Sequence, residues 1–264
     1  MSKNNPFDVH GISHLSASNI NLFIQDRPKW IMSYLFNIKE SSSPQAIRGQ
    51  ELELGISQIF TDHLNEEPLL TSKDIKNKFI SECNKAEVDM NSDKYIKEEN
   101  NIEDWYKFLF DNFFRREILG NEGYRSNFLS YQQKIEVYFE DLAIPFIGYI
   151  DFLYKDMVVD LKTTKIKTSK VSESHKRQMA VYSMAHQNKI MKLVYSTPKA
   201  IWTQSFKYKD LENYRKVLEY CGFAIQKFLS VSKDKYELAS MFYPDYDSWM
   251  WSEELKYKSK EIWR

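Results

Sequence analysis

The chain has 264 residues, of which 42% are hydrophobic and 15% aromatic, so it can bury a full core within one domain. Lysine plus arginine and aspartate plus glutamate each number 37, which gives a formal net charge of zero, an unusual value for a nucleic-acid-binding protein. Seven glycines and seven prolines argue against a fibrous or disordered protein. The only cysteines, Cys83 and Cys221, disfavour a disulfide framework and a structural zinc site.

The first third of the chain is predicted to be helical. Ser16 or Ser18 can cap a first helix, which Pro28 kinks or divides. Residues 47–64 have the apolar spacing of a second helix.

A helical insertion is expected next, at about 65–125. Charged and aromatic residues recur at helical spacing over about 73–90 and 101–119, and the polar stretch 91–100 is interpreted as a linker. Such an insertion could form a wall over a substrate.

The rest of the chain alternates strands and helices. Strands are expected at 128–139, 145–154, 157–163, 191–196 and 200–206. A helix at 172–187 precedes the fourth strand, and helices at 211–229 and from Ser252 follow the fifth. This order, with helices on either side of a three-strand meander, predicts an α+β fold.

The second and third strands carry the most informative residues. If Lys155 and Asp156 form a two-residue turn, Asp151 falls directly opposite Asp160, and Lys162 lies on the same face. Tyr149 continues this polar side. The opposite face then takes the apolar residues Ile150, Phe152, Val159 and Leu161.

Two carboxylates facing each other across a strand pair repel, unless a positive charge lies between them. Oxygen ligands suit Mg²⁺ or Mn²⁺, and a neighbouring lysine can orient a nucleophile or stabilise developing negative charge. The hairpin therefore predicts metal-assisted phosphodiester hydrolysis. The alternative is a solvated hairpin face with ordinary charges, and because Lys-Asp is not a preferred turn pair, a longer turn would shift the pairing.

These residues resemble motifs II and III of the PD-(D/E)XK nuclease superfamily, in which Asp151 precedes a short hairpin and the sequence Asp160-Leu-Lys-Thr. Upstream, Gly49 is followed four residues later by Glu53, as in motif I of phage lambda-type exonucleases, whereas RecB-like nucleases usually have His there. Glu53 is the third acidic residue that the resemblance implies, and Glu51 is the weaker candidate.

Two more segments resemble the RecB-like branch. Gln178 and Tyr182 match its Gln-x-x-x-Tyr element, whose spacing places both side chains on one helical face. Residues 15–18 resemble its N-terminal helix, where the family often has Cys at the position of Asp26. The resemblance runs from about residue 14 to the carboxyl-terminal segment and is weakest over about 62–125.

The resemblance implies a single domain over 1–264, with a restriction-endonuclease-like core: a central mixed sheet flanked by helices, and the helical insertion. It implies Mg²⁺ or Mn²⁺ held by Glu53, Asp151, Asp160 and the backbone carbonyl of Leu161, with Lys162 as the catalytic lysine. Two cysteines cannot hold the four-cysteine iron-sulfur cluster of some relatives. Aromatic packing around Trp249 and Trp251 is expected to pin the carboxyl terminus instead.

A lysine-rich run follows the hairpin and is a candidate path for a DNA backbone, although it is also compatible with an exposed basic loop. The candidate substrate-binding residues are Ser18, Lys165, Lys167, Arg177, Gln178 and Tyr182. No histidine has metal-ligand spacing, and His175 is only a possible phosphate contact.

The sequence thus favours a metal-dependent DNA exonuclease that acts at DNA ends in recombination, repair or phage DNA processing. An endonuclease of the same superfamily and a non-catalytic DNA-binding protein are the alternatives. DNA is the expected partner, with a helicase or single-strand annealing protein possible. Because no apolar run of about 18 residues or signal peptide is seen, we expect a cytoplasmic protein of a bacterial cell or phage-infected host, with no membrane association.

Overall fold

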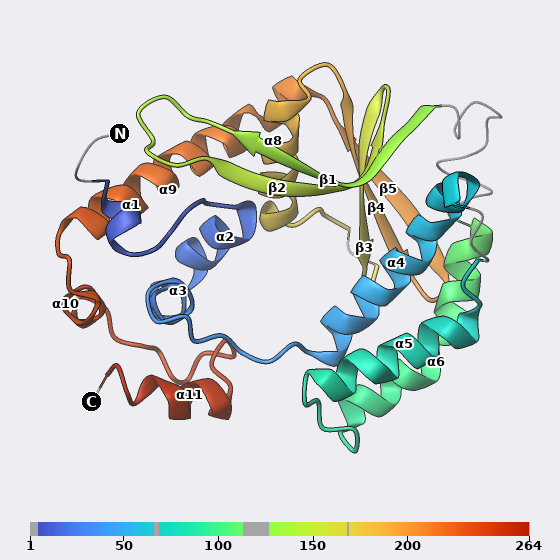
Figure 1. Ribbon diagram of the computed structural model, residues 1–264, viewed down its shortest axis with the longest axis horizontal. Coiled ribbons are helices and arrows are strands. Elements are labelled where there is room, and N and C mark those ends of the chain that lie inside the picture. Colours follow the sequence, from blue (N-terminus) through green and yellow to red (C-terminus); the bar gives the residue numbers. More distant parts are fainter. Residues whose placement is uncertain (1–4, 66–68, 113–126, 168, 264) are drawn as a thin grey trace.

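The protein is organised around one mixed sheet in the computed structural model, which describes residues 5–65, 69–112, 127–167 and 169–263 (Figure 1). The strands follow the order β1-β2-β3-β4-β5. They are β1 (Phe128–Val137), β2 (Phe146–Tyr154), β3 (Met157–Thr163), β4 (Ile190–Thr197) and β5 (Ala200–Phe206). Neighbouring strands are antiparallel except β3 and β4, which run parallel. This mixed sheet, flanked by helices, confirms the expected α+β, restriction-endonuclease-like fold.

The described part of the chain begins with three short helices. They are α1 (Pro6–Val9), α2 (Ala17–Gln25) and α3 (Arg27–Tyr34). Ser16, rather than Ser18, caps α2, because its hydroxyl accepts a hydrogen bond from the Asn19 amide at 3.1 Å. Asp26 caps α3, and Pro28 lies in the first turn of that helix, so the predicted division of the first helix is confirmed.

Two helices in the range of the predicted insertion pack against α4, the helix that carries Glu53. They are α5 (Ser72–Lys85) and α6 (Asp93–Asn112), and α4 spans Pro44–Asn65. The predicted linker at 91–100 is wrong, because α6 begins at Asp93 and already buries Tyr95 and Glu98 in its first two turns. The part of the second predicted helix at 113–119 lies outside the described residues.

The remaining helices follow the meander. The helix α8 (Glu173–Ala185) makes the crossover that the parallel strands β3 and β4 require. After β5 come a 3-10 turn, η2 (Tyr208–Leu211), and the helices α9 (Glu212–Ser230), α10 (Lys235–Ser240) and α11 (Glu253–Ser259). The short helices α1 and α10 were not predicted, because neither is long enough to show helical periodicity.

The core has two main parts. Apolar residues of α4, α5 and α6 pack with Phe152, Val159 and Leu161. Those of α2, α8 and α9 pack with Leu153, Val158 and Ile150. The prediction for the apolar face is therefore confirmed for Phe152, Val159 and Leu161 but wrong for Ile150, which joins the other part of the core.

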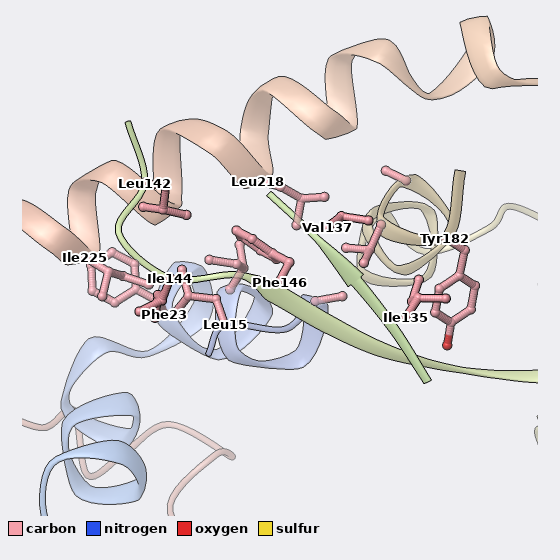
Figure 2. Packing of buried hydrophobic residues seen from close by; sticks show 14 of the residues in the cluster. Leu15, Phe23, Ile135, Val137, Leu142, Ile144, Phe146, Tyr182, Leu218 and Ile225 are labelled. Atoms are coloured by element: carbon pink, nitrogen blue, oxygen red, sulfur yellow. The ribbon is translucent and has the colours of Figure 1, made fainter. Parts of the chain in front are cut away.

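Figure 2 shows how α9 packs along the β1–β2 hairpin. Leu218 and Ile225 of α9 point toward Phe146 and the loop before it. The helix comes close there because Gly222 has no side chain; a Cβ at this position would lie 3.1 Å from a methyl carbon of Leu142. This packing holds the hairpin in place, so that β2 can carry its part of the site.

The β2–β3 hairpin has the predicted register. Phe152 pairs with Val159 and Leu153 with Val158, as a two-residue turn at Lys155 and Asp156 requires. Beyond Phe152 the recorded pairing with β3 ends, although β2 stays paired with β1 as far as Phe146. The two strands therefore separate at Asp151.

The carboxyl-terminal segment is pinned to the start of α3, as expected. The Trp251 indole donates a hydrogen bond to Asp26 at 2.7 Å, and Lys29 donates to the Met250 carbonyl at 2.7 Å. Trp251 also makes an edge contact with the ring of Trp263. In contrast, Trp249 is 90% exposed. None of the described helices has the length and apolar character needed to cross a bilayer.

Candidate active site

Two buried aspartates lie where β2 and β3 separate. Asp151 is 6% exposed and Asp160 is fully buried. With the pairing between the strands ended, the Leu161 amide donates its hydrogen bond to Asp151 Oδ2 at 2.9 Å. The Asp151 side chain thus bridges the separating strands and faces the interior, which disagrees with the alternative of a solvated hairpin face.

Lys162 forms an ion pair with Asp160. Its Nζ lies 2.7 Å from Asp160 Oδ2, and its side chain remains 24% exposed. Asp160 Oδ2 receives this ion pair but no well-aligned hydrogen bond from the described residues. Burial favours the neutral amine, but the Asp160 and Asp151 carboxylates outweigh it and raise the pKa of Lys162 above its usual value. Lys162 is therefore an ammonium at neutral pH and acts as a cation in this structure.

Glu53 reaches the site from α4. Gln132 donates a hydrogen bond to Glu53 Oε1 at 2.6 Å, and the Tyr131 hydroxyl lies 3.3 Å from the same oxygen. Gln132 has a left-handed backbone with φ of 51°, a conformation that is uncommon for residues other than glycine. Such strain is often found at functional sites. Here the left-handed residue, Gln132, is the one whose side-chain amide donates a hydrogen bond to Glu53.

The three carboxylates influence one another electrostatically. Burial raises the pKa of Asp151 well above its usual value, and the negative charges of Asp160 and Glu53 raise it further. The pKa of Glu53 is also raised, first by burial and then by Asp160, although the Gln132 hydrogen bond opposes this. Three acidic groups thus converge on a region where Lys162 supplies the nearby positive charge.

The close approach of α4 to β3 depends on Gly49. A Cβ at this position would lie 3.1 Å from Thr163 Oγ1, so a side chain there would require this hydroxyl to shift by a few tenths of an ångström. The neighbouring Arg48 donates a hydrogen bond to the same hydroxyl at 3.3 Å. Glu51, the weaker acidic candidate, lies near Glu82 of α5 instead.

A chain of hydrogen bonds connects Gln178 through Tyr182 to Asp160. Gln178 Nε2 donates to the Tyr182 hydroxyl at 2.7 Å, and that hydroxyl lies 3.5 Å from Asp160 Oδ1 and also bonds the Tyr149 carbonyl. Tyr182 is only 2% exposed. Tyr182 contacts Asp160 from one side, and Tyr182 and Gln178 both line a pocket beside the site.

The predicted substrate-binding cations have different surroundings. Lys165 makes an ion pair with Glu98 of α6, and Arg177 is 9% exposed and donates to Asn21 of α2. Lys167 is exposed, with its ammonium 5.8 Å from the Trp202 ring centre. Ser18 is exposed and lines the same pocket as Gln178. Lys165 and Arg177 therefore have partners within the protein, and a role for them in substrate binding stays a prediction.

His175, Tyr131 and Gln132 are near the site but were not assigned to it from the sequence. His175 Nδ1 lies 2.8 Å from the Tyr195 hydroxyl. Burial, and to a lesser extent the charge of Lys162, lower the pKa of His175 to about 4. No sequence signal marks Tyr131 or Gln132, because their roles arise from strand pairing and a local left-handed backbone.

The donor set fits a hard divalent cation. Three carboxylates face one ammonium, the pKa of Asp151 is raised by like charges, and Asp160 Oδ2 lacks a well-aligned hydrogen bond. Within the described part of the chain, however, no three acidic, histidine or cysteine side chains form a ready-made metal cluster. Each carboxylate instead has a protein partner: Leu161, Lys162 or Gln132. Binding a cation would require these contacts to rearrange.

Comparison with known proteins agrees with the geometry. The family model of the PD-(D/E)XK nuclease superfamily matches residues 14–243, and the chain therefore belongs to this superfamily. Nucleases of this superfamily generally use divalent metals, usually Mg²⁺ or Mn²⁺. Among curated proteins, none matches the chain. A solved structure titled "Crystal structure of SSO0001" is 14% identical to this chain, with a TM-score of 0.32. The alignment covers 64% of this chain and 83% of the chain in that structure. This similarity is too remote to support a functional argument.

Proposed function

We propose that this chain is a deoxyribonuclease that depends on Mg²⁺ or Mn²⁺ and acts at DNA ends. The observation that carries the proposal is the convergence of Glu53, Asp151 and Asp160 on one buried, negatively charged region beside the Lys162 ammonium. The preference for ends rests on the resemblance of the Glu53 and Gln178–Tyr182 motifs to those of end-processing exonucleases. A helicase or single-strand annealing protein is the kind of partner that such an enzyme would have in recombination, repair or phage DNA processing.

The roles of the residues follow from their positions. Glu53, Asp151, Asp160 and the Leu161 carbonyl would hold the cation, which when bound supplies Lewis-acid stabilisation of the phosphate and a water of lowered pKa. Lys162, charged at neutral pH, would orient the attacking water and stabilise the negative charge that develops on the phosphate. Tyr182 and Gln178 would keep the Asp160 carboxylate oriented.

The test uses end-labelled linear DNA and closed circular DNA of the same sequence, incubated with purified protein in Mg²⁺, Mn²⁺, Ca²⁺ or excess chelator. We expect the linear DNA to be degraded in Mg²⁺ or Mn²⁺ and the circle to be spared, with binding but little cleavage in Ca²⁺. Cleavage of the circle would identify an endonuclease. Full activity in chelator, or no cleavage of any DNA with either active ion, would contradict the proposal.

A further inference from the structure

Beside the acidic residues lies a pocket of about 410 Å³ whose walls carry no charged side chain. Its polar walls come from Ser16, Ser18, Asn21, Ser174, His175 and Gln178, and we call it the neutral pocket. His175 belongs to this description because its pKa of about 4 leaves the imidazole uncharged at neutral pH. A phosphate group would therefore find no cation in this pocket.

A second pocket, of about 250 Å³, has the opposite character. It is lined by Lys162 and Lys170 together with the hydroxyl-bearing residues Thr163, Thr164, Ser172 and Tyr195, and we call it the cationic pocket. Ammonium and hydroxyl groups are the donors that usually contact phosphate oxygens. His175 lines both pockets, so the neutral and cationic pockets adjoin at this residue.

The neutral pocket has the features that a nucleobase requires. Tyr149 lines it and is 54% exposed, so an aromatic face is available for stacking. Gln178 uses its amide nitrogen to bond Tyr182, which leaves its carbonyl oxygen as an acceptor. Gly148 lets the strand lie close to the Tyr182 ring, because a Cβ there would lie 3.0 Å from that ring. Neutral hydrogen-bonding groups can bond to the edge of a base, and an aromatic ring can stack on its face.

We propose that the neutral pocket receives one unpaired base of the DNA while the cationic pocket holds an adjacent phosphate. This inference rests on the proposed nuclease function and narrows its substrate class to DNA with a single-stranded nucleotide at the site. A base that is paired and stacked within a duplex cannot enter such a pocket without leaving the stack. The neutral pocket suits the uncharged base, and the cationic pocket suits the negatively charged phosphate of the backbone.

The test uses short single-stranded DNA that carries 2-aminopurine at one position, scanned inward from each end, with a dye at the far end for anisotropy. Ca²⁺ replaces Mg²⁺ so that binding is measured without cleavage. We expect the 2-aminopurine emission to change at one position only and Tyr149→Leu to abolish this change. The variant should bind about tenfold more weakly, as expected for the loss of one stacked base. Tyr149→Phe, which keeps the ring, should behave like the wild-type protein.

Lys170→Ala is the matched control in the cationic pocket. It should weaken binding and reduce its salt dependence while leaving the 2-aminopurine response in place. An abasic nucleotide at the responsive position should weaken binding to the wild-type protein but not to Tyr149→Leu. If Tyr149→Leu binds intact and abasic DNA as the wild-type protein does, or if no position responds although the anisotropy rises, the base pocket is refuted. If the anisotropy does not rise with any DNA, the proposed function itself is contradicted.

Discussion

Asp160 is the residue on which the contacts of the site converge. It is fully buried on β3, ion-paired with Lys162 through one oxygen and 3.5 Å from the Tyr182 hydroxyl through the other. A buried carboxylate with one oxygen that lacks a well-aligned hydrogen bond is costly for a fold, and the ion pair with Lys162 offsets part of this cost. Its burial also means that substitutions here need to preserve shape, because truncation to alanine would leave a cavity.

Asp160→Asn should reduce DNA cleavage by at least about a hundredfold, since it removes the charge that a cation and Lys162 require but keeps the side-chain volume. Lys162→Met should have an effect of similar size, because it keeps the aliphatic stem and removes the ammonium. Cleavage rates on linear DNA at saturating Mg²⁺ are the measurement, with circular dichroism as the check on folding. Activity close to the wild-type rate in either folded variant would remove these residues from the site.

Asp151→Asn should stabilise the protein in the absence of metal. Because the folded-state pKa of Asp151 is raised, its stabilising contribution is complete below the unfolded value near 3.8 and is lost as the pH rises through the folded-state pKa. At pH 7 we therefore expect the variant to exceed the wild-type protein by about 1–3 kcal/mol in free energy of unfolding. The Asn side-chain oxygen can still accept from the Leu161 amide.

Urea unfolding in chelator at pH 4.5 and at pH 7 provides the measurement. The advantage of Asp151→Asn should shrink at the lower pH, where the wild-type carboxyl group takes up its proton. Adding Mg²⁺ should raise the stability of the wild-type protein but not that of the variant. A variant that is less stable than the wild-type protein at pH 7 in chelator would show that Asp151 is not electrostatically disfavoured.

The β2–β3 turn shows how a tertiary contact can stabilise an unfavourable local sequence. Neither Lys155 nor Asp156 has a left-handed backbone, so the turn is not of the primed type that two-residue hairpins prefer. Lys189, which precedes β4, instead donates hydrogen bonds to the carbonyls of Tyr154 and Lys155. This cationic contact caps carbonyl groups at the turn and so helps to stabilise it.

Glu98 connects helix α6 to helix α4 and to the segment that follows β3. This carboxylate binds Arg48 of α4 and Lys165, which follows β3, and Arg48 also stacks over Trp105 with its guanidinium carbon 4.2 Å from the ring centre. Burial alone would raise the pKa of Glu98, but Lys165 and Arg48 more than offset it and hold that pKa below its usual value. Glu98 thus links α6 to both the Glu53 helix and the Lys162 strand.

Glu98→Ala should destabilise the protein by about 3–5 kcal/mol, because it leaves the buried Arg48 guanidinium without its counter-charge. The matched control is Glu82→Ala in α5, which breaks an ion pair with Lys85, a side chain that is 67% exposed. Loss of that exposed pair should cost less than about 1 kcal/mol. Urea unfolding of both variants gives the comparison, and equal effects would show that the Glu98 cluster adds nothing beyond a surface pair.

A hydrogen bond from Trp251 to Asp26 joins the carboxyl-terminal segment to the start of α3. Trp251→Phe removes the indole donor but keeps an aromatic ring, so we expect a loss of about 1.5–3 kcal/mol, typical of a hydrogen bond to a charged group. Trp249→Phe, at a residue that is 90% exposed, should leave the melting temperature unchanged. Thermal melts of the two variants test this, and a Trp251→Phe protein as stable as the Trp249→Phe protein would show that the carboxyl-terminal segment is not held by this bond.

Local patterns predicted most of the elements. The alternation in β2 and β3 predicted both strands, and the assumed two-residue turn predicted their register. Ser16, one of two candidate caps, and Pro28 mark the starts of α2 and α3. The prediction failed at residues 91–100, where polar residues suggested a linker although Glu98 is buried inside α6 by partners far away in the sequence. The local pattern also did not show that Arg177 and Lys165 have protein partners, Asn21 and Glu98, which lie far away in the sequence.

The sequence by itself was enough to predict the strands of the meander, because side-chain period is a property of short segments, and the resemblance of its motifs pointed to the superfamily and to the candidate acidic and basic residues. Only the tertiary structure decided that β2 and β3 separate at Asp151, that Gln132 holds Glu53, and that a neutral and a cationic pocket adjoin at His175. These features depend on which distant segments pack together, and packing is set by the whole core rather than by neighbouring residues.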